Sequence, residues 1–310
     1  PPAAPPDPPS PRAPALVGRR AERAELRAAW RPRAGGAAVA VSGPAGIGKS
    51  RLLADLAEHA AGEGAVVLRG AGLDIDGAPP FSLWSEALRD LAARAPAPPP
   101  GTGWAGDLAR LCPAIEARWG AVPPPAASPD VERARLFDAV AEGLEWGARH
   151  APLLVAFEDV HRADGASLAL LAHVARRADR LPGLVALTWR DAEAGPGLAR
   201  ALDDLRRRGA LRAEVALGPL PEEDLVRLVA EAAPGIGPEG ARRAAASAGG
   251  NPLVAREAAR AIAAGREPAE GMRAWVRGPL ARLEGPARVL VECAAAAARP
   301  LRADEAAALV

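Results

Sequence analysis

Eight residues, from Gly43 to Ser50, have the types and spacing of a phosphate-binding loop and read GPAGIGKS. Glycines at 43, 46 and 48 let backbone N–H groups turn inward and surround phosphate oxygens. The segment fits the pattern GxxxxGK[ST] in full, in which the lysine reaches the β- and γ-phosphates of a nucleotide and the hydroxyl ligates Mg²⁺. We therefore predict a phosphate site formed by Gly43, Gly46, Gly48, Lys49, Ser50 and the adjacent Arg51.

Lys49 is the only lysine among the 39 lysine and arginine residues of the chain. A compact ammonium fits a tight phosphate loop, whereas the bulkier planar guanidinium does not. The single lysine at this position therefore favours a phosphate-binding role over a chance glycine-rich turn.

Two acids, Glu158 and Asp159, follow the apolar run at 153–157. The carboxyl ends of buried parallel strands are where ligands bind in open α/β sheets. One carboxylate can hold Mg²⁺ and the other can orient an attacking water. By strand position we assign the metal to Glu158, together with Ser50, and the water to Asp159. The alternative for Asp159 is a helix N-cap.

Arg190 follows the next apolar run, at 184–188. Its permanent charge and several donors suit a γ-phosphate, although the residues alone favour a salt bridge at the strand end. His161, in the loop after the acidic pair, is expected to be structural or solvated. Four tryptophans are expected to pack in the core or between helices, rather than to stack on bases: Trp84, Trp104, Trp119 and Trp146.

The elements that must position these residues follow from hydrophobic periodicity. Short apolar runs predict strands at 37–41, 65–68, 153–157, 184–188 and 213–217, and helical spacing predicts helices at 51–60, 131–149, 167–177 and 198–207. The segment at 16–30 is expected to be a short strand or turn and then a helix. Alternating strands and helices predict a parallel α/β sheet covered on both faces. The proline-broken segment at 71–130, with helical patterns at 81–93 and 106–111, is interpreted as an insertion.

Beyond Pro219 only helical patterns remain, at 222–230, 239–248, 254–263 and 279–297. We therefore expect an α/β domain at 16–218 and a small helical domain at 219–275. The Pro/Ala-rich residues 1–15 are expected to be a disordered leader. The chain starts at Pro1 and stops at Val310 inside an apolar pattern, which we interpret as a fragment of a longer protein.

Composition narrows the function classes. The apolar content of 49% can fill one α/β core and small helical modules. A net charge of +1 without a basic run argues against tight non-specific nucleic-acid binding. The two cysteines, Cys112 and Cys293, form neither a disulfide framework nor a zinc motif. No apolar run is long enough for a membrane span and no signal peptide opens the chain, so we expect a cytoplasmic protein.

Together these residues resemble the signal-transduction ATPases with numerous domains, the STAND branch of the AAA-like P-loop NTPases, over roughly residues 16–300. The segment is similar to modules in large ATP-binding regulators of the LuxR type and in proteins associated with adenylyl cyclases. The resemblance implies an α/β P-loop NTPase fold, then a helical lid, then the start of a winged-helix module at 276–310.

The resemblance also implies roles for individual residues. Val17, Gly18 and Arg19 are similar to the entry motif that flanks adenine, and Pro252, in Gly-Asn-Pro, matches the lid proline that packs against adenine. Residues 188–190 match the first sensor, which implies that Arg190 reads the γ-phosphate. Residues 158–164 look like the Walker B strand and its extension, where the family usually has an aromatic in place of the arginine at 162.

The function that this resemblance implies is a slowly hydrolysing switch that binds ATP or ADP with Mg²⁺ and self-associates in the ATP state. Any DNA contact would come through a C-terminal domain outside these residues. A GTPase is disfavoured, because guanine recognition uses Asn-Lys-x-Asp and the only lysine and only asparagine lie far apart, at 49 and 251. A small-molecule kinase and a nucleotide-binding scaffold without significant hydrolysis remain as alternatives.

Overall fold

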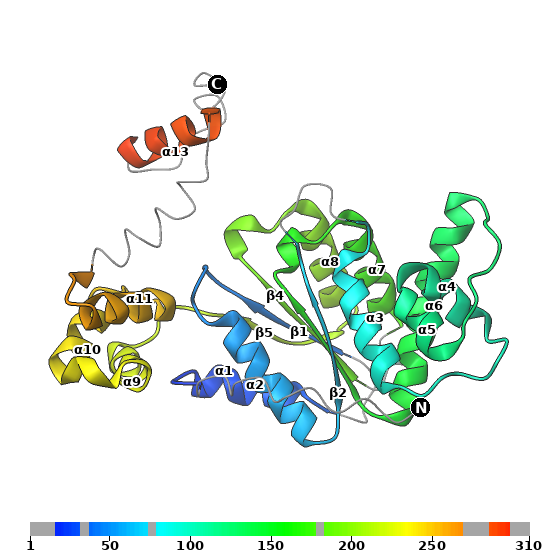
Figure 1. Ribbon diagram of the computed structural model, residues 1–310, viewed down its shortest axis with the longest axis horizontal. Helices are drawn as coiled ribbons and strands as arrows, with labels where there is room; N and C mark the ends of the chain where they lie inside the picture. Colours follow the sequence, from blue (N-terminus) through cyan, green and yellow to red (C-terminus); the bar gives the residue numbers. More distant parts are fainter. Residues whose placement is uncertain (1–15, 32–36, 74–78, 178–182, 269–284, 298–310) are drawn as a thin grey trace. The chain divides into compact units, whose positions relative to one another are not determined.

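The computed structural model describes residues 16–31, 37–73, 79–177, 183–268 and 285–297 (Figure 1). The chain divides into two compact units by its internal contacts. The α/β unit contains Gly18–Gly218, and the helical unit contains Pro219–Val310 together with Pro1–Val17. The expected leader at 1–15 lies outside the described residues, and so does most of the segment at 276–310.

A five-stranded parallel sheet forms the centre of the α/β unit, in the order β2-β3-β4-β1-β5. The strands are β1 (Ala37–Ser42), β2 (Val66–Ala71), β3 (Leu153–Glu158), β4 (Gly183–Trp189) and β5 (Leu211–Ala216). Every residue of β1 is buried, as the continuous apolar run predicts for a strand covered on both faces. The predicted α/β fold is confirmed, with each strand close to its expected position.

Helices cover both faces of this sheet (Figure 1). On one face lie α1 (Arg20–Ala29) and α2 (Lys49–Gly62), and α2 contacts β1, β2, β3 and β4. The other face packs against α3 (Ser82–Arg94), α6 (Pro129–His150), α7 (Gly165–Arg176) and α8 (Pro196–Arg207) in one apolar core. Gly18 and Arg19, at the entry to α1, have left-handed backbones, so this entry is a turn.

The insertion after β2 is helical and packs through its aromatic residues. Trp84, on α3, is fully buried and meets Phe157 of β3 edge-on, with ring centroids 4.8 Å apart. Trp104 of α4 (Gly103–Leu111) contacts both Trp119 of α5 (Pro113–Trp119) and Trp146 of α6. The predicted packing role of these tryptophans is confirmed. The short α5 is not predicted from the sequence, because seven residues carry too little periodicity.

The helical unit has its own small core. Its helices α9 (Glu222–Ala232), α10 (Gly237–Ala246) and α11 (Pro252–Ala263) bury Leu225 and Val229 against a set of alanines. A further helix, α13, spans Gly285–Ala297. Within the described ranges, every helix is too short or too polar to cross a membrane.

Candidate functional site

The glycine-rich loop connects β1 to the first turn of α2. Gly43, Gly46 and Gly48 have φ angles of 143°, 74° and 107°, which side-chain-bearing residues rarely adopt. A Cβ atom at Gly43 would also lie 2.9 Å from the carbonyl oxygen of Leu217. The loop therefore needs glycine for its backbone course, and it leads directly into the N-terminus of α2, whose dipole favours an anion.

The side chain of Lys49 lies inside this loop. Its ammonium donates hydrogen bonds to the carbonyl oxygens of Gly43 and Pro44, each at 2.9 Å, and the residue is only 7% exposed. Burial lowers the pKa of Lys49, and the nearby carboxylate of Asp159 opposes this shift. A phosphate would offer the ammonium a charged acceptor in place of two neutral carbonyls, and charge-assisted hydrogen bonds are stronger.

The next two residues of α2 differ in their surroundings. Ser50 is exposed in the first turn of α2, directly beside the loop. Arg51 forms an ion pair with Glu58, farther along the same helix, at 3.1 Å. Ser50 is thus the better placed of the two for a contact at the loop, and Arg51 is engaged on the helix surface.

The acidic pair lies at the carboxyl end of β3. Glu158 is the last residue of the strand, in register with Ala71 of β2, and is half-buried. Asp159 follows with a left-handed φ of 50°, and its backbone N–H donates to the hydroxyl of Thr188 on β4 at 3.1 Å. Asp159 precedes the 3₁₀ turn η1 (Val160–Arg162), but its side chain makes no capping hydrogen bond there. The carboxylate of Asp159 is therefore not a helix N-cap.

Arg190 lies directly after β4 and pairs with Glu193 of the 3₁₀ turn η3 (Asp191–Glu193). One guanidinium nitrogen of Arg190 donates to Glu193 Oε1 at 2.7 Å, and the backbone N–H of Arg190 donates to Nδ1 of His161 at 3.4 Å. The salt bridge that the residues alone favour at this strand end is present. The sequence does not predict a role for Glu193. The one feature that points to it is its spacing of three residues from Arg190.

His161 is buried between the two loops. Its side chain is 1% exposed, and its Nε2 lies 3.2 Å from Glu193 Oε2. Burial lowers the pKa of His161, and the carboxylates of Asp159 and Glu193 act in the opposite direction. Because Nδ1 accepts from Arg190, a neutral ring carries its proton on Nε2, which lies near Glu193 but makes no hydrogen bond. Of the two expected settings, structural or solvated, the structure shows the buried one.

Asp164 has a structural role at the start of α7. Its carboxylate accepts from the backbone N–H and hydroxyl of Ser167 at 2.8 and 2.6 Å, and from the backbone N–H of Phe81 at 3.2 Å. Burial raises the pKa of Asp164, but these hydrogen bonds outweigh burial, so the pKa lies below its usual value. Asp164 therefore caps α7 and joins it to the start of α3.

The residues expected around adenine lie in different units. Arg19 pairs with Glu22 at 3.0 Å and also donates to the carbonyl of Gly218, so it links the two ends of the α/β unit. Pro252 begins α11 in the helical unit, directly after Asn251, which caps the helix by accepting from the N–H of Leu253 at 3.0 Å. The adenine assignments of Val17, Gly18, Arg19 and Pro252 stay predictions.

Charged groups from the loops after β3 and β4 act on Lys49. Burial is the largest influence on its pKa and lowers it. Asp159 raises the pKa, Arg190 lowers it, and Asp191 and Glu193 raise it, in decreasing order of effect. In the described part of the chain, no group of three or more His, Cys, Asp or Glu side chains could hold a metal ion. Mg²⁺ in nucleotide sites is held by few protein oxygens together with phosphates, so a hydroxyl and a carboxylate such as Ser50 and Glu158 fit that chemistry.

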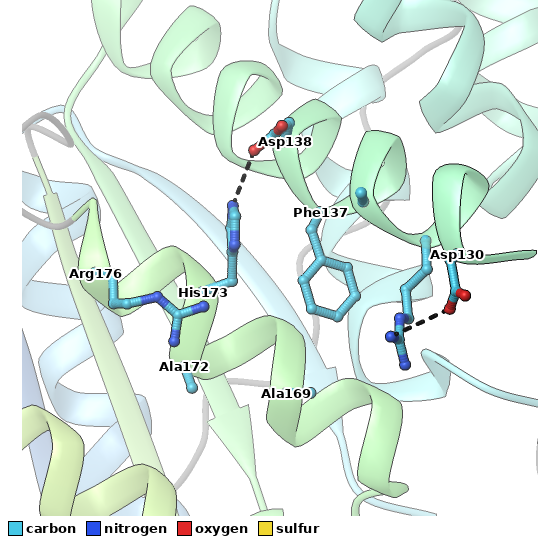
Figure 2. A pocket seen from close by; sticks show the side chains of 9 residues that line it. Asp130, Phe137, Asp138, Ala169, Ala172, His173 and Arg176 are labelled. Carbon is cyan, nitrogen blue, oxygen red and sulfur yellow. Dashed lines mark ion pairs between the residues drawn. The ribbon is translucent and has the colours of Figure 1, made fainter.

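A separate groove of about 590 Å³ lies between α6 and α7, and Figure 2 shows its lining. The ring of His173 packs edge-on against Phe137 and lies 3.2 Å from Asp138, with Ala169 and Ala172 alongside. None of the predicted site residues lines this groove. It is therefore distinct from the site at the glycine-rich loop.

Known proteins resemble this chain both in sequence family and in fold. Residues 15–187 match the family model of the AAA ATPase domain, a segment that includes the glycine-rich loop and the acidic pair and ends before Arg190. The fold is similar to that of a Walker-type ATPase of Pyrococcus abyssi, with a TM-score of 0.50, 15% identity and coverage of 95% of this chain and 88% of that one.

Two further solved structures are similar at lower scores. One is the ORC2 protein of Aeropyrum pernix, with a TM-score of 0.46, 17% identity and coverage of 96% of this chain and 68% of that one. The other is a STAND protein with a tetratricopeptide repeat sensor from Pyrococcus horikoshii, with a TM-score of 0.43, 20% identity and coverage of 80% of this chain and 30% of that one. The chain thus spans less than a third of the STAND protein's length. No curated protein matches the chain.

Proposed function

The chain belongs to the AAA ATPase domain family, and from this premise we propose that it is an ATP-binding, slowly hydrolysing switch module of a bacterial signalling or transcriptional regulator. The observation that carries the proposal is the glycine-rich loop, whose backbone requires glycine and which encloses the buried ammonium of Lys49. A loop of this form at a helix N-terminus is suited to the phosphates of a nucleotide.

The proposed roles follow from the positions of the side chains. Lys49 and the loop N–H groups bind the β- and γ-phosphates, and Ser50 with Glu158 holds Mg²⁺, which neutralises phosphate charge when bound. Asp159 orients the attacking water. Its carboxylate is the charged group that acts most strongly on Lys49, which supports its place beside the phosphates.

The contacts to the rest of the nucleotide are proposed from the family resemblance. Arg190 reads the γ-phosphate, and its permanent charge and proximity to Lys49 support that role. Val17, Gly18, Arg19 and Pro252 frame the adenine, and Arg51 adds positive charge near the loop. In this proposal residues 16–218 form the nucleotide-binding domain, residues 219–275 form a lid, and residues 276–310 begin a winged-helix module.

The biological setting is proposed on the same grounds. A switch of this kind holds one form with ADP and another with ATP, and the ATP form self-associates. The resemblance to LuxR-type regulators favours a cytoplasmic regulator that contacts DNA through a further domain.

Calorimetric titration with ATP, ADP and GTP in the presence of Mg²⁺, with hydrolysis followed in the same samples, tests the proposal. Adenine nucleotides are expected to bind in preference to GTP, with turnover over minutes or longer. Fast turnover that requires an added acceptor would instead indicate a small-molecule kinase, and binding without turnover would indicate a scaffold.

Lys49→Ala is the matching variant. It is expected to abolish nucleotide binding while the thermal unfolding transition is retained. Arg133→Ala, which removes an exposed cation from α6, is the control and is expected to bind normally. Unchanged ATP affinity in Lys49→Ala would refute the site assignment.

A further inference from the structure

Glu193 joins the loops that follow β3 and β4. Its Oε1 accepts a hydrogen bond from Arg190 at 2.7 Å, and its Oε2 lies 3.2 Å from Nε2 of the buried His161. The backbone N–H of Arg190 donates to the other nitrogen of the same ring at 3.4 Å. Arg190, Glu193 and His161 therefore lie together, with Oε1 of the carboxylate hydrogen-bonded to Arg190 and Oε2 close to a ring nitrogen that makes no hydrogen bond.

The two partners of Glu193 differ in how freely they can move. The imidazole of His161 is enclosed, with 1% of its side chain exposed, and its Nε2 lies close to one oxygen of the carboxylate without a hydrogen bond to it. The side chains of Arg190 and Glu193 are 28% and 45% exposed, so this half of the set is open to a competing anion. The hydrogen bond from Arg190 is the main cause that lowers the pKa of Glu193.

We propose that Glu193 is a positioning residue that retains Arg190 and that the γ-phosphate of ATP must compete with it for the guanidinium. The inference rests on the proposed function, because it takes the nucleotide site at Lys49 and the sensor role of Arg190 as given. Under this proposal Glu193 sets how strongly the site distinguishes ATP from ADP.

Glu193 affects ATP and ADP binding differently because only ATP carries a γ-phosphate. ADP has no γ-phosphate and leaves the pair between Arg190 and Glu193 intact. ATP gains a charge-assisted contact with Arg190 only when the pair opens, so the free energy of the pair is subtracted from ATP binding alone. Once Arg190 leaves, Nε2 of His161, which is buried and makes no hydrogen bond, is 3.2 Å from the carboxylate, and the half-exposed carboxylate can also be solvated.

The test compares dissociation constants for ATP and ADP in the wild-type chain and in Glu193→Gln, measured by calorimetry. The amide keeps the size of the side chain and removes its charge. ATP is expected to bind roughly two- to fivefold more tightly in the variant, the scale of one partly exposed ion pair, and the ADP constant is expected to stay unchanged. In an Arg190→Ala background, Glu193→Gln is expected to change neither constant.

Glu239→Gln provides the matched control. Glu239 pairs with Arg242 at 3.0 Å with the same three-residue spacing, but on α10 of the helical unit. This substitution is expected to leave the ratio of ATP to ADP affinity unchanged. Glu193→Ala, which removes the carboxylate altogether, is expected to shift the ratio in the same direction as Glu193→Gln.

The outcomes separate the inference from the function on which it rests. If the wild-type chain binds both nucleotides and Glu193→Gln leaves the ratio unchanged, or changes both constants equally, Glu193 is merely structural and the inference is wrong. If the wild-type chain binds neither nucleotide, the proposed function itself fails. A shift in the ratio that persists without Arg190 would also overturn the inference, because the arginine would not be the group that Glu193 retains.

Discussion

The hydroxyl of Thr188 accepts a hydrogen bond from the backbone N–H of Asp159 at 3.1 Å. The two residues lie at the carboxyl ends of the adjacent strands β4 and β3, and Thr188 is fully buried. Asp159 has a left-handed backbone, which is uncommon outside glycine and needs support from its surroundings. A buried threonine on one strand thus holds the backbone of the acidic residue that follows the next strand.

Thr188→Val should destabilise the chain. Valine fills nearly the same space but leaves the N–H of Asp159 without its acceptor, so the free energy of unfolding is expected to fall by about 1–3 kcal/mol. Urea unfolding measures this change. Thr102→Val, at a residue whose hydroxyl donates to Pro99 near the surface, is the control and should have a smaller effect. Equal stability of Thr188→Val and the wild type would show that the hydrogen bond does not support this turn.

Asp164→Ala should destabilise the chain in a pH-dependent way. The substitution removes the N-cap of α7 and the link to Phe81, and is expected to lower the free energy of unfolding by about 1–2 kcal/mol at pH 7. The pKa of Asp164 is lower in the folded chain than its usual 3.8, so the charged form contributes stability above that value. The contribution is lost as pH falls from 3.8 through the folded pKa, and the difference between wild type and variant should narrow there.

Urea unfolding at pH 7 and below pH 4 tests this pH dependence. Asp130→Ala is the control, because Asp130 also lies in the first turn of a helix but its side chain is 94% exposed. Its effect should be small at both pH values. If the difference in unfolding free energy between wild type and Asp164→Ala grew as the pH fell, the pKa of Asp164 would not be lowered in the folded chain.

Glu158→Gln and Asp159→Asn should separate the metal role from the water role. If Glu158 holds Mg²⁺, Glu158→Gln is expected to weaken ATP binding roughly ten- to hundredfold with Mg²⁺ present and to leave binding in EDTA unchanged. Asp159→Asn is expected to bind ATP normally and to hydrolyse it about a hundredfold more slowly. Calorimetry and phosphate release measure the two effects. Normal hydrolysis in Glu158→Gln would count against its role at the metal.

Much of the α/β fold could be predicted from local patterns. The strands β1, β3 and β4 are continuous apolar runs, and a strand covered on both faces needs apolar side chains at successive positions. The glycine-rich loop could also be predicted from the sequence, since positive φ angles at Gly43, Gly46 and Gly48 restrict the residue type at each position. These features depend on neighbours in the chain and are therefore visible in the residue order.

Other features of the site depend on residues far apart in the chain. The sheet order β2-β3-β4-β1-β5 places β4 beside both β1 and β3, and long crossover connections leave such neighbours undetermined by local pattern. Only this arrangement brings Thr188 to Asp159, and His161 to Glu193.

By itself, then, the sequence determined the glycine-rich loop, the acidic pair and the α/β class, because each rests on the conformational or burial preference of consecutive residues. The tertiary structure decided which charged groups act on Lys49 and that Arg190 is paired with Glu193. Electrostatic and hydrogen-bond partners are chosen by distance in space, and the packing of β3 and β4 side by side sets that distance.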